Sequence, residues 1–323
     1  MSFLLEFDSV RKYFEVVRVF ALKNRPTVKA VDGVTFGIRT GTTFGLVGES
    51  GCGKSTIAKL AVRLLEPTDG TIRFAGREML RGDRGQAIGL GREIGMIFQD
   101  AYASLNPRHK VRQILALPFK LHTDWPDREI EREGMRLLEA VGLSPAEQFL
   151  DRYAHELSGG QRQRVVIARA ISLHPQLVVA DEAVSSLDLS MRAQILKMMG
   201  ELKANYNLTY LYITHDLGVV RSLCDEVAVM YLGKIVEMAF VDALYSSPLH
   251  PYTQLLLEAT PIPNPRRARA RSRRIMQGEV PSASNVPSGC RFHPRCPFAM
   301  PQCAEEPRLI RIGDHSVACH LHG

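Results

Sequence analysis

The sequence lacks several features of membrane and secreted proteins. None of its apolar runs approaches the roughly 18 consecutive residues that a membrane-spanning helix needs. The opening MSFLLEFD has an early acidic residue and no basic segment, so it does not match a secretion signal. Cysteine occurs only six times in 323 residues, which is few for a disulfide-rich secreted domain. We therefore expect a protein that stays in the cytoplasm.

The composition is that of a globular protein with a sizeable core. Hydrophobic residues make up 45% and charged residues 23% of the chain, and its length allows more than one domain. The net charge is +7, and part of it comes from one run, PRRARARSRR at residues 265–274. Prolines just before this run favour a solvated linker, whereas the charge alone would also suit nucleic acid or anionic lipid.

Strand-like and helical segments alternate along most of the chain. Apolar, strand-like runs are expected at 30–38, 43–47, 71–74, 92–99, 177–180 and 209–213. A helix is expected at 56–65, and helical periodicity extends from 111 to about 170. This order predicts an α/β fold with a mostly parallel sheet and an inserted helical subdomain at about 100–170. We place a nucleotide-binding domain at 1–250 and a small Cys-rich extension at 251–323.

A phosphate-binding loop is predicted directly after the apolar run at 43–47. The motif G-x-x-x-x-G-K-[ST] is matched there, and its backbone N–H groups can form a concavity at the positive end of a helix. Lys54 is expected to reach the β- and γ-phosphates, and Ser55 to place its hydroxyl on Mg²⁺. The nucleotide-binding residues are Gly48, Glu49, Ser50, Gly51, Cys52, Gly53, Lys54, Ser55 and Thr56.

Two acids end another strand-like run, Leu177 to Ala180. Asp181 would lie at the carboxyl end of its strand, where open α/β sheets bind ligands, and can hold Mg²⁺ through water. Glu182 is the better candidate for polarising the attacking water. Gln99 and His215 also follow strand-like runs. Each alone would be an ordinary surface residue, but their order beside a phosphate loop indicates a hydrolytic nucleotide site.

Residues 3–250 resemble the ATPase subunits of ABC transporters. The resemblance implies the ABC ATPase cassette fold: a RecA-like, mostly parallel sheet core, an antiparallel β subdomain and an inserted helical subdomain. It also implies Glu182, His215 and Gln99 as catalytic residues, and Ser55, Gln99 and Asp181 as Mg²⁺ ligands. The matching positions are Tyr13 (adenine-stacking aromatic), 48–56 (Walker A), Gln99 (Q-loop), Ser158, Gly159, Gly160 and Gln161 (signature), Asp181 and Glu182 (Walker B), Asp188 (D-loop) and His215 (switch histidine).

In that family two ATPase units pair head to tail, with ATP between one unit's Walker A loop and the other's signature. The signature residues of this chain would therefore contact nucleotide held by a partner. Two departures are visible: Ala183 stands where the family usually has proline, and the D-loop is SSLD rather than SALD. Neither removes a catalytic group.

A finer resemblance points to the importers of di- and oligopeptides, and within them to the F-type ATPase subunit. It rests on the strings GLVGESGCGKST, SLNPR, LSGGQRQRVVIARA, MYLGKIVE, SPLHPYTQLLLEATP and GEVPS. It implies ATP and Mg²⁺ as cofactors, and a peripheral position on the cytoplasmic face of the cell membrane. The implied partners are a second, D-type ATPase subunit, two integral membrane permease subunits and, indirectly, an extracytoplasmic peptide-binding protein.

Other functions remain open at the level of sequence. Nickel importers share much of this pattern. A soluble ABC ATPase acting on nucleic acid or ribosomes would suit the arginine run, although the chain has one Walker A motif and no insertion in its cassette. A nucleotide-binding regulator without turnover is the third alternative, and Glu182 and His215 argue against it.

The last part of the chain gathers four cysteines: Cys290, Cys296, Cys303 and Cys319. In a cytoplasmic protein stable disulfides are disfavoured, so clustered thiols indicate a metal. The close C-x₂₋₄-C pairs typical of structural zinc are absent, while four thiolates suit a [4Fe–4S] cluster. The resemblance to peptide-importer subunits also implies such a cluster. Zinc and metal-free thiols remain the alternatives.

Overall fold

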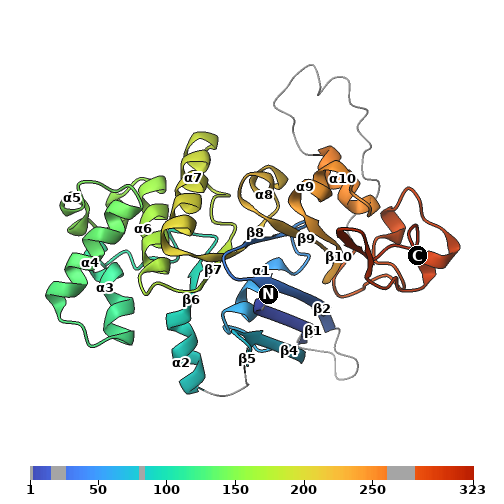
Figure 1. Ribbon diagram of the computed structural model, residues 1–323, viewed down its shortest axis with the longest axis horizontal. Coiled ribbons are helices and arrows are strands. Elements are labelled where there is room, and N and C mark those ends of the chain that lie inside the picture. The colour runs from blue at the N-terminus through green and yellow to red at the C-terminus, as the bar shows by residue number, and fades with distance from the viewer. Residues whose placement is uncertain (1–2, 16–26, 80–83, 260–280) are drawn as a thin grey trace, which may run out of the picture.

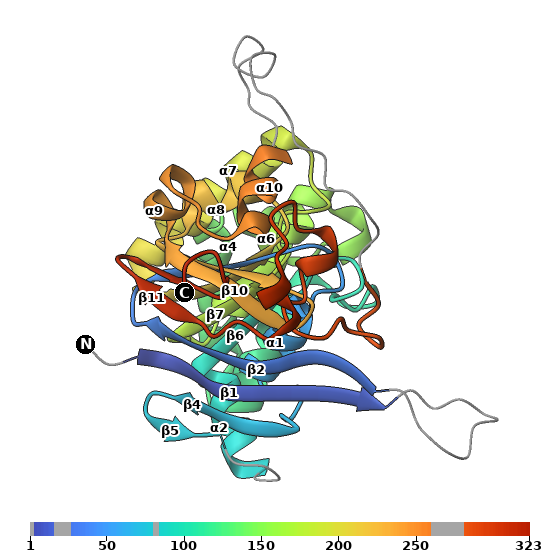
Figure 2. The same ribbon diagram turned by 90° about the vertical axis from the view of Figure 1, so that its right-hand side faces the viewer.

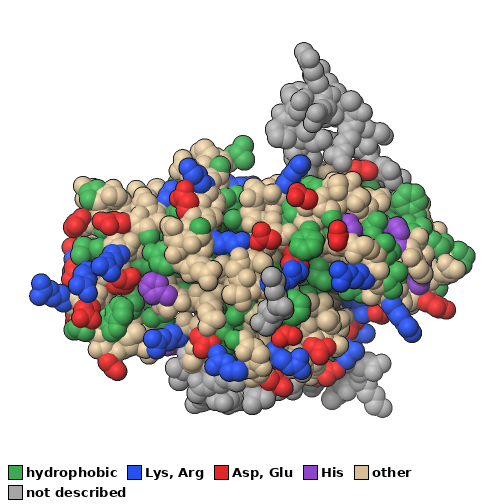
Figure 3. Space-filling view, in the orientation of Figure 1, with side chains coloured by type: hydrophobic (Ala, Val, Ile, Leu, Met, Phe, Trp, Pro, Cys, Tyr) green, Lys and Arg blue, Asp and Glu red, His purple; other side chains and the backbone are tan. Residues whose placement is uncertain are grey.

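The computed structural model describes residues 3–15, 27–79, 84–259 and 281–323. The arginine run at 265–274 and the prolines before it lie outside the described residues. Among the described helices, none combines the length and the apolar character that a bilayer crossing requires. Side chains of both charge signs are interspersed over the face shown in Figure 3.

The core of the molecule is an eight-stranded sheet with the order β11-β12-β10-β9-β3-β8-β7-β6. The consecutive strands from β9 to β6 pair in parallel, and the remaining pairs are antiparallel. Strands buried on both faces read as continuous apolar runs, which is why they were visible in the sequence. The strands are β3 (Thr43–Val47), β6 (Ile94–Ile97), β7 (Leu177–Asp181), β8 (Thr209–Thr214), β9 (Glu226–Tyr231), β10 (Lys234–Phe240), β11 (Ile310–Ile312) and β12 (His315–Val317).

A second, four-stranded antiparallel sheet packs below the core in Figure 1, with α1 (Lys54–Ala61) between the two sheets. The rings of Phe7 and Phe36 stack at 4.7 Å and those of Phe36 and Phe44 at 5.1 Å, and these residues share one apolar cluster with α1. In Figure 2 the long strands β1 and β2 cross beneath the core sheet. The strands, in the order β2-β1-β4-β5, are β2 (Thr27–Arg39), β1 (Phe3–Glu15), β4 (Asp69–Phe74) and β5 (Arg77–Glu78).

The inserted helices form a separate lobe at the left of Figure 1. α4 buries Ile130, Gly134, Leu137 and Leu138, which recur at helical spacing, so one stripe of the helix faces the lobe's core. This confirms the predicted helical insertion. The helices are α3 (Val111–His122), α4 (Asp127–Ala140), α5 (Glu147–Leu150), η1 (Ala154–Glu156) and α6 (Gly159–Ile171), and α7 (Leu189–Tyr206) packs beside them.

Several element boundaries differ from the sequence-based expectation. α1 begins at Lys54 and ends at Ala61, rather than spanning 56–65, because Arg63 takes a positive φ of 60° and the chain turns there. The helix α2 (Arg84–Glu93) was not predicted, since its sequence RGQAIGLGRE is rich in glycine, a poor helix former. Because α2 runs to Glu93, the strand expected at 92–99 is limited to Ile94–Ile97.

The C-terminal segment adds strands and helices to the same core. α8 (Leu217–Leu223), α9 (Val241–Ser246) and α10 (Pro251–Ala259) cover the end of the sheet that β9 and β10 form, and β12 pairs with β10. Fully buried Glu237 accepts N–H groups from Leu249 and His250 at 2.8 and 2.9 Å and lies 2.9 Å from His315 Nδ1. Polar contacts as well as strand pairing therefore attach the extension. Its remaining turns are η2 (His293–Arg295) and η3 (Pro301–Ala304).

Candidate nucleotide-binding site

The predicted phosphate loop connects β3 to α1 in the middle of the core sheet. Two of its glycines are required by close backbone approach. A Cβ on Gly48 would lie 2.1 Å from Met230 O, and one on Gly53 would lie 2.0 Å from Ala30 O, with φ of 110° at Gly53. No other residue type fits at either position. The loop therefore has the tight backbone that a phosphate cradle needs.

Lys54 is the first residue of α1 and only 5% exposed. Its Nζ donates to the carbonyl oxygens of Gly48 and Glu49 at 2.8 and 2.9 Å, so the ammonium group lies within the curve of the loop. Because α1 begins where the loop ends, the positive end of its dipole and its free N–H groups are expected to face the loop. This arrangement can bind a polyphosphate.

Ser55 and Asp181 meet at the carboxyl end of the parallel strands. Their Oγ and Oδ1 atoms are 3.2 Å apart, and both residues line a cavity of 430 Å³ together with Gln99. Burial, and to a lesser degree the charge of Glu182, raises the pKa of Asp181, while the hydrogen bond from Ser55 lowers it. Hydroxyl, amide and carboxylate oxygens are the donors that Mg²⁺ prefers, so the residues fit a magnesium ion.

Glu182 lies next to this cavity, and its carboxylate contacts the two other predicted catalytic residues. Gln99 Nε2 is 3.0 Å from Oε2 of Glu182, and His215 Nδ1 is 3.1 Å from Oε1. The backbone of Glu182 has a φ of 49°, a left-handed conformation that non-glycine residues adopt at a cost. Its N–H group donates to Ile213 O at 2.9 Å, which fixes the end of β7 against β8.

The signature residues lie in another part of the molecule, at the start of α6. Ser158 caps this helix: its Oγ accepts the N–H of Gln161 at 3.2 Å, and Oε1 of Gln161 accepts the N–H of Ser158 at 3.0 Å. Gly160 packs closely against Met191. A Cβ at position 160 would lie 1.6 Å from the methionine methyl group. Among the described residues, no hydrogen bond joins these residues to the phosphate loop.

Family models match both parts of the chain. A model described as ABC transporter matches residues 31–185, and one described as oligopeptide/dipeptide transporter, C-terminal region, matches residues 236–303. The oligopeptide transport ATP-binding protein AppF of Bacillus subtilis is 47% identical over 99% of this chain and 97% of its own length. The chain belongs to the ATP-binding subunits of oligopeptide/dipeptide ABC transporters. The recognition made from its motifs is confirmed.

Further relatives agree with this assignment, and a solved structure shows the fold. The di/tripeptide transport ATP-binding protein DppF of Pseudomonas aeruginosa is 42% identical over 99% of this chain and 98% of its own length. OppF of Escherichia coli, an oligopeptide transport ATP-binding protein, is 42% identical over 98% and 95%. A dimeric post-hydrolysis structure of the ATP-binding cassette MJ0796, bound to ADP and Pi, has a TM-score of 0.65 at 24% identity, covering 73% of this chain and 98% of that one. The predicted ABC ATPase fold is thereby confirmed.

Tyr13, the residue that matches the family's adenine-stacking aromatic, lies near the end of β1. Its hydroxyl group donates a hydrogen bond to Asp32, and burial together with this bond raises the pKa of Tyr13 to about 12. Burial on its own would raise the pKa of Asp32, but the bond from Tyr13 and the charge of Arg291 outweigh it and lower that pKa. The stacking role itself stays a prediction.

Asp188 and an arginine that the motifs did not reveal organise the D-loop. Asp188 Oδ1 accepts the N–H of Met191 at 2.9 Å and so caps α7. Arg192, one turn into that helix, donates to Asp216 at 2.8 Å and to Leu187 O at 3.4 Å. Arg192 therefore connects the D-loop to the residue that follows His215. Its position, four residues after Asp188, could have indicated this role only after the D-loop had been located in the sequence.

The four tail cysteines lie in one neighbourhood, and each of three thiols is electrostatically affected by two others. Burial raises the pKa of Cys290, Cys296 and Cys319, while backbone hydrogen bonds from the residues two positions further along lower it. Among the described residues, no group of three or more His, Cys, Asp or Glu side chains is arranged to hold a single metal ion. Cys52 and Cys224 are free thiols outside this group.

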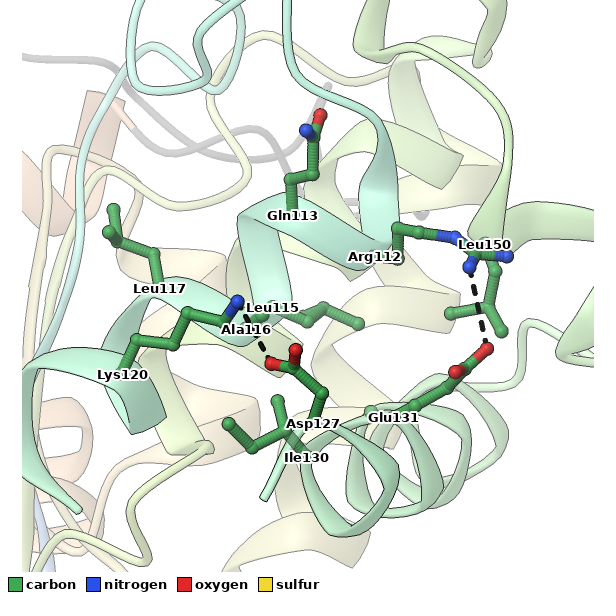
Figure 4. Close-up of a pocket in the computed structure, with 11 residues that line it drawn as sticks. Arg112, Gln113, Leu115, Ala116, Leu117, Lys120, Asp127, Ile130, Glu131 and Leu150 are labelled. Carbon is green, nitrogen blue, oxygen red and sulfur yellow. Dashed lines mark ion pairs between the residues drawn. The ribbon is translucent and has the colours of Figure 1, made fainter. Parts of the chain in front are cut away.

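A cavity of 400 Å³ lies between α3 and α4, away from all predicted site residues (Figure 4). Two ion pairs cross it: Lys120 with Asp127 at 2.9 Å, and Arg112 with Glu131 at 3.6 Å. Apolar side chains such as Leu115 and Ile130 form its floor. Nothing about its lining suits a nucleotide, because its cations are already paired.

Proposed function

We propose that the chain is the ATP-hydrolysing subunit of an importer of di- and oligopeptides and works at the cytoplasmic face of the cell membrane. The observation that carries this proposal is one cavity beside the phosphate loop that Ser55, Asp181 and Gln99 line. Glu182 joins this group through its bonds to Gln99 and His215. The peptide substrate is supported by the relatives, which are oligopeptide and di/tripeptide transport ATP-binding proteins and match nearly the whole chain.

In the proposed reaction each residue of the site has a separate task. Lys54 and the N–H groups of the phosphate loop bind the β- and γ-phosphates. Ser55, Asp181 and Gln99 hold Mg²⁺, directly or through water; when bound, this ion neutralises charge on the phosphate oxygens. Glu182 orients and polarises the attacking water, since its carboxylate is the one that both Gln99 and His215 reach.

The site is completed by a second ATPase subunit, which we take to be a different, D-type chain. Ser158, Gly159, Gly160 and Gln161 contact the nucleotide that this partner holds, and Asp188 lies at the same interface. Support comes from their position: Ser158 and Gly159 are exposed on the surface of the helical lobe. ATP then favours the closed pair and hydrolysis the open one, which moves two permease subunits. An extracytoplasmic protein delivers the peptide to them.

We propose that the tail cysteines Cys290, Cys296, Cys303 and Cys319 hold a [4Fe–4S] cluster. Four sulfur donors in one neighbourhood and backbone N–H groups directed at three of them suit such a cluster. When bound, the cluster cross-links the extension.

The ATPase proposal is tested with Glu182→Gln. Hydrolysis by the assembled transporter should fall by at least about a hundredfold, because a positioned general base contributes roughly 10²–10⁴ in rate. ATP binding should persist, and the subunit pair should be trapped with nucleotide. Glu201→Gln, an exposed acid on α7, is the matched control and should hydrolyse ATP like the wild type. Loss of binding, or unchanged turnover, would contradict the assignment of Glu182.

Two further measurements test substrate and cluster. Uptake of a radiolabelled tripeptide into cells should cease when the gene is deleted and return with the wild-type chain but not with Glu182→Gln. Unchanged tripeptide uptake combined with lost nickel uptake would refute the peptide substrate.

Iron and sulfide analysis of the anaerobically purified chain should detect both elements, and Cys296→Ser should lower their amounts. Detection of zinc alone would overturn the proposed cluster.

A further inference from the structure

The segment between the first two tail cysteines, CRFHPRC at residues 290–296, reaches back to the nucleotide site. Its two arginines, Arg291 and Arg295, have side chains that are only 7% and 6% exposed. Both bond to residues of the cassette. We call 290–296 the bridging segment.

Arg295 forms a two-pronged ion pair with Glu49 of the phosphate loop. Its Nη1 lies 2.8 Å from Oε2 and its Nη2 lies 3.2 Å from Oε1, and Nη1 also donates to Tyr231 Oη at 3.3 Å. The bonds to Glu49 raise the pKa of Arg295, so the guanidinium stays charged. Paired N–H···O bonds of this kind are strong and fix the carboxylate in orientation as well as distance.

Glu49 is thereby held at three points. Its N–H group donates to Tyr252 Oη at 2.9 Å, its carbonyl oxygen accepts Lys54 Nζ at 2.9 Å, and its carboxylate binds Arg295. Tyr252 is itself packed against Phe292 of the bridging segment, with ring centroids 5.3 Å apart. Two of the three restraints on this loop residue therefore depend on the C-terminal part of the chain.

The negative charge of Glu49 explains why this arrangement matters for nucleotide binding. A carboxylate in a phosphate-binding loop repels a triphosphate, and Glu49 is such a carboxylate. Arg295 supplies the opposite charge, and holding Glu49 at a fixed position keeps the loop shaped before nucleotide arrives. Arg291 repeats the pattern on the adenine side: it binds Asp32 and Leu232 O, and Asp32 accepts the hydroxyl group of Tyr13.

We propose that the C-terminal extension is a part of its own chain's ATP site, with Arg295 and Arg291 as positioning residues. Arg295 neutralises and orients Glu49 of the phosphate loop, and Arg291 orients Tyr13 through Asp32. This inference rests on the proposed ATPase function. It assigns to the extension a role in nucleotide affinity rather than in hydrolysis.

Arg295→Gln in the full-length chain is the central test. The Kd for a fluorescent ATP analogue and the KM for ATP should rise about tenfold, the size expected when a charge-assisted hydrogen bond is lost, while kcat stays within about twofold. Adding Glu49→Gln to Arg295→Gln removes the uncompensated charge and should recover most of the affinity. Arg295→Lys keeps the charge but cannot form both N–H···O bonds, so its loss of affinity should be clearly smaller than that of Arg295→Gln without vanishing. Arg308→Gln, exposed on the same extension, is the matched control.

The outcomes separate the inference from its premise. Wild-type chain that does not bind ATP refutes the proposed function. Wild-type binding with an unchanged Arg295→Gln variant refutes the inference alone. A loss in Arg295→Lys as large as in Arg295→Gln, or no recovery in the double variant, shows a purely structural contact and also overturns it. If Arg295→Gln fails to fold, the Lys variant and the double variant still decide.

Discussion

The chain carries two unlike halves of a nucleotide site. In the phosphate-loop half, Lys54 and Asp181 are buried, and their side chains bond to loop carbonyls and to Ser55. Glu182 is half-buried and bonds to Gln99 and His215. In the signature half, Ser158 is exposed and bonded only within its own helix cap. The first half is assembled by folding of this chain alone, whereas the second presents polar groups that another molecule can use.

This difference predicts that variants in the two halves fail in different assays. Changes in the phosphate-loop half should affect the isolated chain, because its contacts are internal. Changes in the signature half should appear only when two ATPase subunits work together. The three predictions that follow use this separation.

The largest effect is expected for Ser158→Asp in the assembled transporter. Aspartate also caps helices well, so α6 should keep its stability. Its negative charge would face the phosphates of the partner's nucleotide, and hydrolysis should fall about a hundredfold, as for loss of a phosphate-binding donor in other enzymes. ATP binding by the isolated chain should not change. A drop in that binding would show that the two halves are not independent.

An intermediate effect is expected for Arg192→Gln. Without this arginine the D-loop is no longer joined to Asp216, and the neighbouring His215 loses its fixed position. Since small displacements of catalytic groups can cost up to about 10² in rate, we expect kcat to fall about tenfold at an unchanged KM. Lys197→Gln, an exposed cation on the same helix, should have no effect. A raised KM with normal kcat would place Arg192 in the phosphate-loop half instead.

The smallest effect concerns acid stability through His250. Burial, and then the charge of His322, lowers the pKa of His250 to about 3, against an ordinary value of 6.5. The unfolded chain therefore takes up a proton that the folded chain does not. The folded state loses stability as the pH falls through about 6.5, the pKa of this histidine in the unfolded chain. Between pH 7.5 and 6.0 we expect a loss of about 1 kcal/mol in urea unfolding.

His250→Asn should reduce this acid sensitivity, because it removes the imidazole that takes up the proton. The local contact should be kept, since the Asn amide oxygen can accept the N–H group of Tyr252, which in the wild type bonds Nδ1 of His250 at 3.0 Å. Because Tyr252 also holds Glu49, ATP affinity should decline along with stability in acid. An unchanged pH slope in the Asn variant would exclude His250 as the responsible group.

The phosphate-loop half could largely be predicted from sequence because its chemistry depends on short local patterns. Glycines 48 and 53, Lys54 and the acids that end β7 all lie in motifs whose strand and helix context is visible along the chain. Arg295 could not be found in this way, since its partner Glu49 is 246 residues away and a single arginine between cysteines resembles any basic tail residue. Buried Glu237 was equally hidden, because its partners come from two separate segments.

The antiparallel addition of β12 to β10 has a practical consequence for shortened forms of this chain. If the chain ended near residue 250 after incomplete translation or proteolysis, the backbone donors and acceptors of β10 that pair with β12 would be exposed to solvent. β10 would then be an unprotected edge strand, with an open margin of unpaired backbone groups. Such margins recruit other strands and lead to aggregates. Cellular quality control should therefore remove products that lack the tail, even though every motif for ATP hydrolysis would still be present in them.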